Sequence, residues 1–398
     1  MNNLLPIFQS GFRKGHSTET LLVRLLSDIY GAIDKSQVTL LALFDVSAAF
    51  DTVDHDILQK RLSTSFGLSG NFLDWLGSFL HDRSFSVVYG STRTPWVPAP
   101  YGLPQGSVLG PLLYIIYTAD LGSLLAASSV LSQSYADDLQ AYLHCLAPAA
   151  ISTVRVMSRA METLEAWMSS NRLRLNSSKT QFIWFGTRQQ LAKIDLKVLA
   201  QEFPQFTFSS SVRDLGVTLD QELTFTRHIN LLCRSCYYQL RQLRVVLRSL
   251  TFNAALTLVH SFVVSRLDYC SALYVGLPVT RVGCLDRVLR SAARLVGRIP
   301  RFGHVSDYMR DVLHWLPFSQ RITYRISSLV WRCLAGVAPV YLQELCCSTL
   351  NIQRRGSLRS SKQAELLVPR SRTSILRSAV PFLSLALQPG MGFLWNYV

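Results

Sequence analysis

Three aspartates follow stretches that the sequence predicts as buried strands. Asp45 comes directly after the apolar run Val38–Phe44, and Asp137 and Asp138 follow Tyr135–Ala136. Two ionised carboxylates at a separation of ~4 Å repel each other by about 4 kcal/mol at an effective dielectric constant of roughly 20, and a divalent cation removes that cost. Carboxylates that converge on Mg²⁺ from two strands are what two-metal phosphoryl transfer requires. Taken alone, an Asp-Asp pair is more typical of a turn or a helix cap.

The elements that must position these aspartates follow from hydrophobic periodicity. Apolar residues at helical spacing predict helices, and short β-prone apolar runs predict strands. The predicted helices cover residues 17–30, 54–65, 71–81, 111–124 and 151–170. The predicted strands cover residues 38–44, 85–89 and 181–185, with two further short strands within 131–142. Because these elements do not alternate as regular βαβ units, the sequence predicts an α+β fold whose sheet is covered on one face.

The charge of the 398-residue chain is concentrated in its second half. Residues 1–200 carry a net charge of +1 and residues 201–398 a net charge of +14, and 23 of the 24 basic residues in the second half are arginines. The planar guanidinium binds phosphate and stacks on bases, so a polyanion is the expected partner. An anionic membrane surface is the competing explanation.

Two stretches of the second half are predicted as basic helices, with arginines near one face at helical spacing. A solvated charged face is the alternative, but few acidic residues are present to neutralise these arginines. We expect contact with a nucleic-acid backbone. The first predicted helix, Ile229–Ser249, carries Arg234, Arg241, Arg244 and Arg248, and the second carries Arg287, Arg290, Arg294 and Arg298.

Hydropathy and cysteine content indicate the cellular compartment of the protein. The mean hydropathy is +0.21, but no apolar run approaches the ~18 residues of a spanning helix, and the first residues do not resemble a signal peptide. The eight cysteines are scattered through apolar segments, which favours buried thiols over a disulfide framework. Cys233 and Cys236 form a C-x-x-C pair without a second pair at zinc-site spacing. We expect a protein of a reducing compartment that does not bind membranes.

Four motifs in a fixed order carry a family resemblance. They are Gln9–Thr18 (QSGFRKGHST), Phe44–His55 (FDVSAAFDTVDH), Gly102–Ser107 (GLPQGS) and Tyr135–Asp138 (YADD). In this order and spacing they resemble the reverse transcriptases of LINE-type (non-LTR) retrotransposons. Leu173–Thr180 and Arg213–Val217 resemble the next two blocks of that family, and His314–Pro317 resembles the C-terminal region of jockey-superclade elements.

The resemblance implies a right-hand polymerase fold. Residues 1–210 would form a partial fingers region and an antiparallel palm, and residues 211–300 the primer grip and a helical basic thumb. Residues 301–350 would form a C-terminal helical extension, and residues 351–398 a flexible basic tail. The implied activity is transfer of deoxynucleotides to a primer 3′-hydroxyl, directed by an RNA template. The cofactor would be two Mg²⁺ ions, with Mn²⁺ as a substitute. The protein would be located in the nucleus or the cytoplasm.

Residue roles also come from the resemblance. Asp45 and Asp137 would be the main metal ligands and Asp138 an assisting carboxylate, since neighbouring strand residues point to opposite faces. Lys179 would protonate the leaving pyrophosphate, although a surface lysine is the alternative. Phe50 would exclude nucleotides that carry a 2′-hydroxyl. The alternative is that Phe50 is an ordinary core phenylalanine.

Further residues would hold the nucleotide and the primer. Gln105 would hydrogen-bond to the nucleotide or template-primer, and Gly106 would let the backbone approach it. Without the resemblance, these two residues belong to an ordinary Pro/Gly turn. Arg13 and Lys14 would neutralise triphosphate charge, or else be exposed loop cations. The primer grip would be formed by Leu215, Gly216 and Val217.

The chain also departs from the family pattern. We expect the endonuclease domain and the first finger strands of complete family members to be missing, which predicts a weakly active enzyme. A protein partner that supplies an endonuclease or fingers is a further expectation. The alternative function is RNA binding without catalysis, in a relic or a domesticated derivative of such an element.

Overall fold

The structure is a computed structural model that describes residues 5–346, which divide into two compact units. Within the described residues, unit 1 contains residues 5–17, 39–184 and 192–209, and unit 2 contains residues 18–38, 185–191 and 210–346. The predicted tail of residues 351–398 lies outside the described residues. Helices and antiparallel strand pairs are both present, in agreement with the predicted α+β class.

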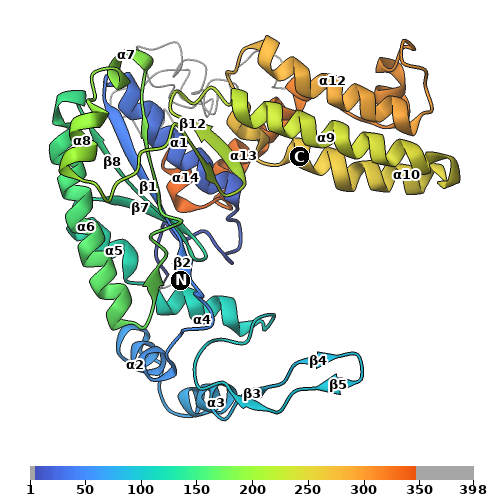
Figure 1. The fold of residues 1–398 in the computed structure, drawn as a ribbon. Helices are drawn as coiled ribbons and strands as arrows, with labels where there is room; N and C mark the ends of the chain where they lie inside the picture. The colour runs from blue at the N-terminus through green and yellow to red at the C-terminus, as the bar shows by residue number, and fades with distance from the viewer. Residues whose placement is uncertain (1–4, 347–398) are drawn as a thin grey trace, which may run out of the picture. The chain divides into compact units, whose positions relative to one another are not determined.

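Unit 1 is built on a four-stranded sheet (Figure 1). Its order is β10 (Gln181–Phe185), β1 (Val38–Phe44), β8 (Asp138–Cys145) and β7 (Leu131–Tyr135). The predicted strands 38–44 and 181–185 are therefore confirmed at their predicted bounds. Almost every residue of β1 is buried, as its continuous apolar sequence requires.

A long helix, α6 (Ala150–Ser170), packs against β8 and confirms the helix predicted over 151–170. Its buried side chains recur every three or four residues, which is the spacing of one helix face. They include Val154, Met157, Ala160, Leu164 and Met168. The same spacing made this helix predictable from the sequence.

The other helices of unit 1 surround the sheet and its loops. The predicted helix 54–65 is α2 (His55–Phe66), where Asp54 Oδ1 accepts hydrogen bonds from the N–H groups of Asp56 and Ile57 at 3.1 and 3.0 Å. This is an N-cap, which satisfies donors at the helix start. Unit 1 also contains α3 (Asn71–Leu80), α8 (Leu196–Glu202), and the strand pair β2 (Val46–Ser47) and β9 (Arg174–Leu175).

The single helix predicted over 111–124 is divided into α4 (Leu109–Tyr117) and α5 (Leu121–Ala127). The break falls at Thr118, whose N–H and hydroxyl both donate to the carbonyl oxygen of Tyr114 at 3.0 Å. By length and apolar composition the stretch Leu109–Ala127 resembles a membrane-spanning helix, contrary to the expectation from the sequence. Half of that stretch is buried inside the protein, which is typical of core helices.

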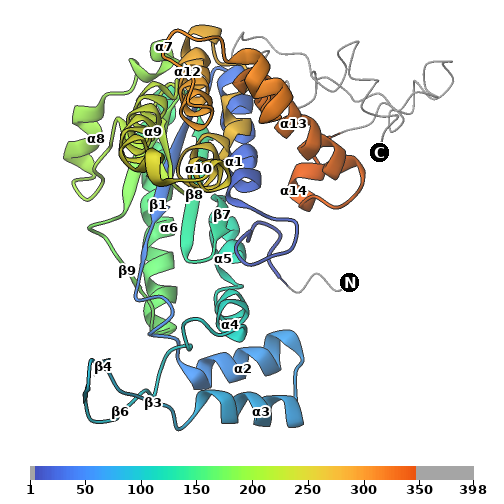
Figure 2. The ribbon, with the colours of Figure 1, turned by 90° about the vertical axis from the view of Figure 1, so that its right-hand side faces the viewer.

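The strand predicted over 85–89 does not form as one strand. It contributes to two nested pairs, β3 (Ser84–Phe85) with β6 (Val97–Pro98), and β4 (Val88–Tyr89) with β5 (Thr92–Arg93). All eight strand residues are exposed, so no second layer holds the strands straight. Figure 2 shows these strands extending beyond α3.

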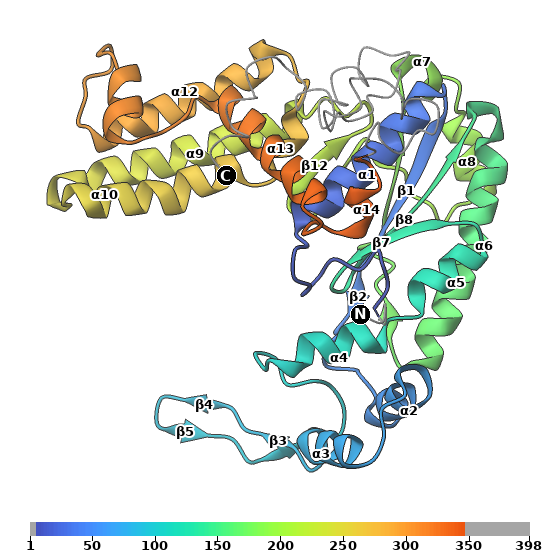
Figure 3. The ribbon, with the colours of Figure 1, turned by 180° about the vertical axis from the view of Figure 1, so that it is seen from behind.

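Unit 2 is mainly helical. Its helices α9, α10 and α12 pack against one another (Figure 3). The two basic helices predicted from the sequence are confirmed as α9 (Thr226–Val246) and α12 (Val279–Val296). The other elements are α7 (Arg188–Leu191), the hairpin of β11 (Ser211–Asp214) and β12 (Val217–Asp220), α10 (Phe252–Val259), α11 (Ser265–Asp268), α13 (Phe318–Leu334) and α14 (Val340–Gln343).

The helix α1 (Thr18–Asp34), predicted over 17–30, belongs to unit 2 and bonds to its last helices. Glu19, whose side chain is 3% exposed, pairs with Arg325 of α13 at 2.6 Å and accepts the Ala272 N–H at 3.1 Å. The Thr20 hydroxyl lies 3.1 Å from the Tyr341 hydroxyl of α14. The start of the chain therefore completes a unit formed mostly by its second half.

Seven cysteines lie in the described part of the chain, and all are free thiols. Cys236 is buried, and Cys233 is intermediate between buried and exposed. Burial raises the pKa of Cys236 to about 11, which keeps it protonated near neutral pH.

Candidate active site

Two of the three candidate aspartates lie at a tight turn between β7 and β8. The turn consists of Ala136, in the left-handed region with φ of 58°, and Asp137, and Tyr135 pairs with Asp138 across it. Such a two-residue connection is typical of a β-hairpin. It places Asp137 at the tip and Asp138 at the first position of β8.

The side chain of Gln9 clamps this turn. Its Oε1 accepts the N–H groups of Ala136 and Gly11 at 3.0 and 2.8 Å, and its Nε2 donates to the Ala136 carbonyl oxygen at 3.1 Å. Gln9 is only 4% exposed, and its backbone bridges to Ser134 of β7. Sequence reasoning placed Gln9 in a motif but missed this role.

Gly11 packs directly on the same turn. A Cβ atom at this position would lie 2.3 Å from the Ala136 nitrogen and 2.8 Å from its Cα. Backbone atoms cannot give way as a flexible side chain does, so only glycine permits this close approach. The first motif therefore supports the aspartate turn through Gln9 and Gly11.

Asp45 lies directly after β1, as predicted. Its carboxylate Oδ2 lies 3.2 Å from Nζ of Lys179, and its carbonyl oxygen accepts the Asn176 N–H at 2.8 Å. The lysine side chain is 66% exposed and that of Asp45 is 32% exposed, so water screens the pair. The structure thus brings the predicted proton donor and a predicted metal ligand together.

The three aspartates influence one another electrostatically. The pKa of Asp138 is raised to about 6 by desolvation, then by the negative charges of Asp137 and Asp45. A carboxyl group with this pKa is near its titration point, and a nearby cation would favour its ionised form. Among residues 5–346, no three His, Cys, Asp or Glu side chains are close enough to form a ready metal site.

Phe50 lies in the turn that follows β2. Its ring stacks on that of Tyr114 in α4, with a centroid distance of 4.7 Å and an interplanar angle of 25°. Tyr114 is almost fully buried, and this burial raises the pKa of its phenol above its ordinary value. The partly exposed Phe50 therefore rests on a rigid neighbour.

The loop of residues 102–106 is bonded to the loop of Phe50. The N–H groups of Gly102 and Leu103 donate to the carbonyl oxygens of Val53 and Phe50, both at 2.8 Å. A Cβ atom on Gly102, whose φ is 88°, would lie 2.8 Å from the carbonyl oxygen of Asp51. Two of the predicted nucleotide-binding segments are thus brought together.

Gln105 and Gly106 lie at the exposed end of this loop. Gln105 Nε2 donates to Asp51 Oδ1 at 2.9 Å. Gly106 has a φ of 83° and open space around its missing side chain. Asp51, which the sequence did not single out, therefore orients one predicted nucleotide-binding side chain.

Arg13 and Lys14 differ in their surroundings. Arg13 Nη1 donates to the carbonyl oxygens of Pro6 and Gln9, the latter at 3.0 Å. Lys14 is exposed. Arg13 therefore braces the first motif within its own segment, while Lys14 reaches solvent.

In unit 2, the predicted primer grip forms the turn between β11 and β12. Leu215 and Gly216 both have positive φ values, of 43° and 84°, and Val217 begins β12. The Tyr269 hydroxyl donates to the Leu215 carbonyl oxygen at 2.7 Å. A Cβ atom on Gly216 would lie 3.4 Å from the Tyr269 ring, so this tyrosine braces the turn.

The two basic helices of unit 2 differ in how their arginines are engaged. Arg290 pairs with Asp286 at 2.6 Å, Arg294 donates to the Gly303 carbonyl oxygen at 3.3 Å, and Arg298 lies beyond the end of α12. Arg287 is exposed. The predicted arginines of the first helix are all exposed and form no ion pair within residues 5–346; they are Arg234, Arg241, Arg244 and, just after α9, Arg248.

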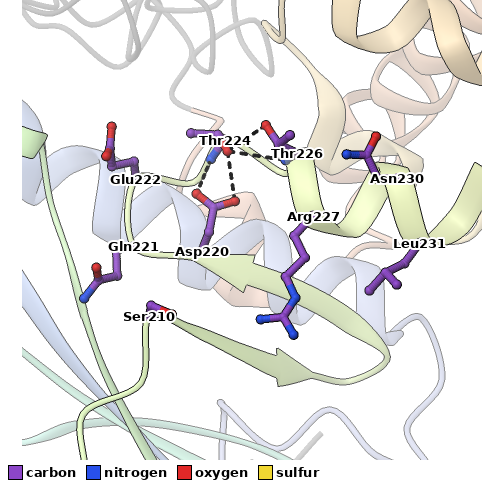
Figure 4. Close-up of a pocket in the computed structure, with 9 residues that line it drawn as sticks. All are labelled: Ser210, Asp220, Gln221, Glu222, Thr224, Thr226, Arg227, Asn230 and Leu231. Carbon is purple, nitrogen blue, oxygen red and sulfur yellow. Dashed lines mark hydrogen bonds between the residues drawn. The ribbon is translucent and has the colours of Figure 1, made fainter.

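A cavity of about 560 Å³ lies at the start of α9 and contains none of the predicted catalytic residues (Figure 4). Asp220 accepts hydrogen bonds from the N–H and the hydroxyl of Thr224 at 2.8 and 3.1 Å. The Thr224 hydroxyl also lies 3.0 Å from that of Thr226. The side chains of Asp220, Thr224 and Thr226 thus hydrogen-bond to one another, and none of the three candidate aspartates lines the cavity.

Comparison with known families gives a match over more than half of the chain. The matching family is described as "Reverse transcriptase (RNA-dependent DNA polymerase)", and the match covers residues 1–219. This range includes the aspartate turn, Asp45, Phe50, Lys179 and the primer-grip turn.

Curated relatives come from insect transposons. A probable RNA-directed DNA polymerase from transposon BS of Drosophila melanogaster is 35% identical over 255 residues, which are 61% of this chain and 27% of the relative. The RNA-directed DNA polymerase from mobile element jockey of Drosophila funebris is 30% identical over 246 residues, 58% of this chain and 25% of that protein. The chain thus spans about a quarter of the length of these relatives.

Among solved structures, apo telomerase from Candida tropicalis is similar at 11% identity with a TM-score of 0.42. That similarity covers 80% of this chain and 54% of the telomerase chain.

Proposed function

We propose, since the chain belongs to the reverse transcriptase (RNA-dependent DNA polymerase) family, that it copies RNA into DNA by transferring deoxynucleotides to a primer 3′-hydroxyl. The family match and the α+β architecture agree with the predicted right-hand polymerase fold. The similarity to jockey-type elements likewise agrees with the predicted non-LTR retrotransposon origin.

One observation carries this proposal. Asp45 and the Asp137–Asp138 turn are about ninety positions apart in the sequence, yet the pKa of Asp138, which desolvation raises first, is raised further by the charges of Asp137 and Asp45. Two buried strands and a buried glutamine clamp hold these carboxylates within electrostatic reach of one another. Mutual repulsion is a cost to folding unless the cluster has a cationic ligand.

The donor set fits divalent magnesium. Carboxylate oxygens are the ligands that Mg²⁺ prefers, and the pKa of Asp138, raised first by desolvation and then by Asp137 and Asp45, is one that a bound cation would lower. Asp45 and Asp137 would be the main ligands and Asp138 the assisting one, with Mn²⁺ as a substitute. When bound, two such ions lower the pKa of the attacking 3′-hydroxyl and neutralise charge on the triphosphate.

The chain's own side chains would orient the nucleotide. Phe50, supported from below by Tyr114, would contact the sugar and exclude a 2′-hydroxyl. Gln105, oriented by Asp51, and Gly106 would contact the nucleotide from the neighbouring loop. Lys179 would donate a proton to the leaving pyrophosphate, and Lys14 would attract the triphosphate.

Unit 2 would hold the nucleic acid. The exposed arginines of α9 suit phosphate contacts, because positive side chains without an internal partner can release counterions from a polyanion. Leu215, Gly216 and Val217 would contact the primer end. This proposal includes the palm, thumb and extension boundaries predicted from the sequence. It also includes a location in the nucleus or cytoplasm and a protein partner that supplies an endonuclease or fingers.

Primer extension on an RNA template with purified protein, Mg²⁺ and deoxynucleotides tests the function. The matched control is the double variant Asp137→Asn/Asp138→Asn, which keeps side-chain size and removes both charges. Extension by the natural protein that disappears in this variant is the expected result. Absence of extension by the natural protein, with RNA binding retained, contradicts the proposal.

A second candidate function is RNA binding without polymerisation. The exposed arginines of α9 favour it, because they can contact phosphates without any metal-dependent chemistry. Under this function the protein binds RNA with a steep salt dependence and shows no Mg²⁺-dependent incorporation. The same extension experiment separates the two functions.

A further inference from the structure

The hairpin of residues 83–101, here called the exposed hairpin, presents aromatic side chains to solvent. Tyr89 is 88% exposed, Trp96 61% and Tyr101 60%, and Phe85 is also exposed. The strands of the hairpin are two residues each and have no core behind them. An isolated two-stranded hairpin is marginally stable, and clustered exposed apolar groups mark interaction sites.

The charge of the exposed hairpin favours a polyanionic partner. Residues 83–101 include two arginines and no aspartate or glutamate. The guanidinium of Arg93 lies 5.4 Å from the centroid of the Trp96 ring, and that of Arg83 lies 5.3 Å from the centroid of the Phe79 ring. Arginine and aromatic groups combined in this way are typical of surfaces that bind single-stranded nucleic acid, with stacked bases and nearby phosphates.

A cleft in unit 1 is lined both by this hairpin and by the predicted nucleotide-binding loop that contains Gln105. The cleft measures about 580 Å³. Its lining includes Arg83, Phe85 and Tyr101 of the hairpin, together with Gly102, Gln105 and Asp51. Because Gln105 is bonded to Asp51, and Gly102 to Val53, the cleft leads to a loop that the Phe50 segment holds in place.

We propose that the exposed hairpin binds the uncopied, single-stranded part of the RNA template, with unpaired bases stacked on Trp96 and Tyr89. This inference rests on the proposed function. A polymerase holds its template as a duplex with the primer behind the active site, while the template ahead of it is unpaired. That unpaired RNA is the ligand whose bases can stack on exposed rings and whose phosphates match Arg83 and Arg93.

Equilibrium binding to primer–template duplexes tests the inference. RNA templates annealed to a DNA primer carry either no 5′ overhang or a short or long 5′ overhang. In the natural protein the overhang is expected to strengthen binding, and Tyr89→Ala/Trp96→Ala is expected to weaken overhang binding by roughly five-fold or more per ring removed. Binding of the template without an overhang is expected to stay unchanged.

A matched control comes from unit 2. Phe302 is 90% exposed and, like Trp96, has an arginine over its ring, at 5.4 Å from Arg301. Phe302→Ala is therefore expected to leave overhang binding unchanged. A photoreactive base placed along the overhang is expected to crosslink to residues 83–101.

Three results would overturn the inference. Equal loss of affinity with and without the overhang would show a general defect, and circular dichroism of the double variant would identify unfolding as its cause. Crosslinks outside the hairpin would place the template elsewhere. Unchanged RNA binding with altered self-association in light scattering would identify a protein interface. In each case primer extension by the natural protein still reports separately on the proposed function.

Discussion

Gln9 and Ala136 are separated by 127 positions, yet the Gln9 side chain bonds to both the N–H and the carbonyl oxygen of Ala136, at 3.0 and 3.1 Å. The Gln9 amide thus bonds to both backbone polar groups of Ala136, as the backbone of a paired strand would. The first motif of the chain thereby acts on the candidate catalytic carboxylates without being one of their ligands.

We expect Gln9→Ala to lower kcat by roughly 100-fold, since small misplacements of catalytic groups have effects of this size. The variant leaves the backbone groups of Ala136 without the Gln9 partner, and because Ala136 is only half-buried the cost is below the roughly 1–3 kcal/mol of a fully buried group. Single-turnover extension and urea denaturation measure both effects. Gln205→Ala, at an exposed glutamine with a 3.4 Å hydrogen bond, is the control. Equal kcat in the two variants would contradict the positioning role.

We expect Lys179→Gln to tighten Mn²⁺ binding by about two- to five-fold, because the ammonium group no longer competes for Asp45. The size is small because both side chains are partly exposed. Lys179→Arg retains the charge and is expected to bind Mn²⁺ like the natural protein. Electron paramagnetic resonance of free Mn²⁺ measures the affinity directly. Weaker binding in Lys179→Gln would show that the lysine supports the metal site instead.

Phe50→Val is expected to relax discrimination against ribonucleotides by roughly 10- to 100-fold, because the pocket loses the ring that meets a 2′-hydroxyl. Competition between ribo- and deoxynucleotides in primer extension measures this ratio. Tyr114→Phe keeps the stacked ring beneath Phe50 and is expected to keep the selectivity. Selectivity that is unchanged in Phe50→Val would remove Phe50 from the sugar contact.

We expect His228 to make unit 2 less stable as the pH falls below its ordinary pKa of 6.5. Desolvation first and Arg213 second lower the pKa of this histidine, whose Nδ1 accepts the Thr218 N–H at 3.1 Å. In the window between the lowered folded pKa and 6.5 the unfolded chain binds more protons, so stability decreases as pH decreases.

Denaturation of the natural protein and of His228→Gln over about pH 5 to 8 measures this dependence. The difference between them is expected to shrink toward acid, because the natural histidine loses its acceptor role on protonation. His304→Gln, at an exposed histidine, is expected to show the natural dependence. Parallel curves for all three proteins would exclude His228 as the cause.

Arg241→Gln/Arg244→Gln is expected to reduce the slope of log K against log salt for RNA–DNA duplex binding by about 2, near 1 for each phosphate contact. Arg290→Gln/Arg294→Gln is expected to change the slope less, because both arginines already bond within unit 2. Filter binding over a salt series measures the slopes. Equal slopes for the two double variants would contradict the assignment to α9.

The sequence was sufficient to predict features set by local pattern. The apolar run of β1 and the helical spacing of α6 predicted these elements, and the sequence placed Asp45 directly after β1. The approach of Asp45 to the Asp137–Asp138 turn depends on the distant pairing of β1 with β8. Sequence spacing also predicted α9 and α12 as basic helices.

Features that depend on distant partners could not be predicted. The Gln9 clamp, the Asp51–Gln105 bond and the brace of Leu215 by Tyr269 join residues that no local periodicity relates. Only residues 85–89 of the exposed hairpin were predicted as a strand, and they divide between two strand pairs, because β-prone residues indicate a strand whether or not another layer covers it. Local pattern likewise does not report which arginines of α12 are bonded to their own unit.

The ion pair between Glu19 and Arg325 also limits when unit 2 can finish folding during translation. The two residues are 306 positions apart, so α1 leaves the ribosome long before α13 is made. At the usual translation rate of about 5–20 residues per second, that interval lasts roughly 15–60 s. During this time Glu19 lacks the guanidinium that neutralises it. Unit 2 can therefore complete its folding only after α13 has been made.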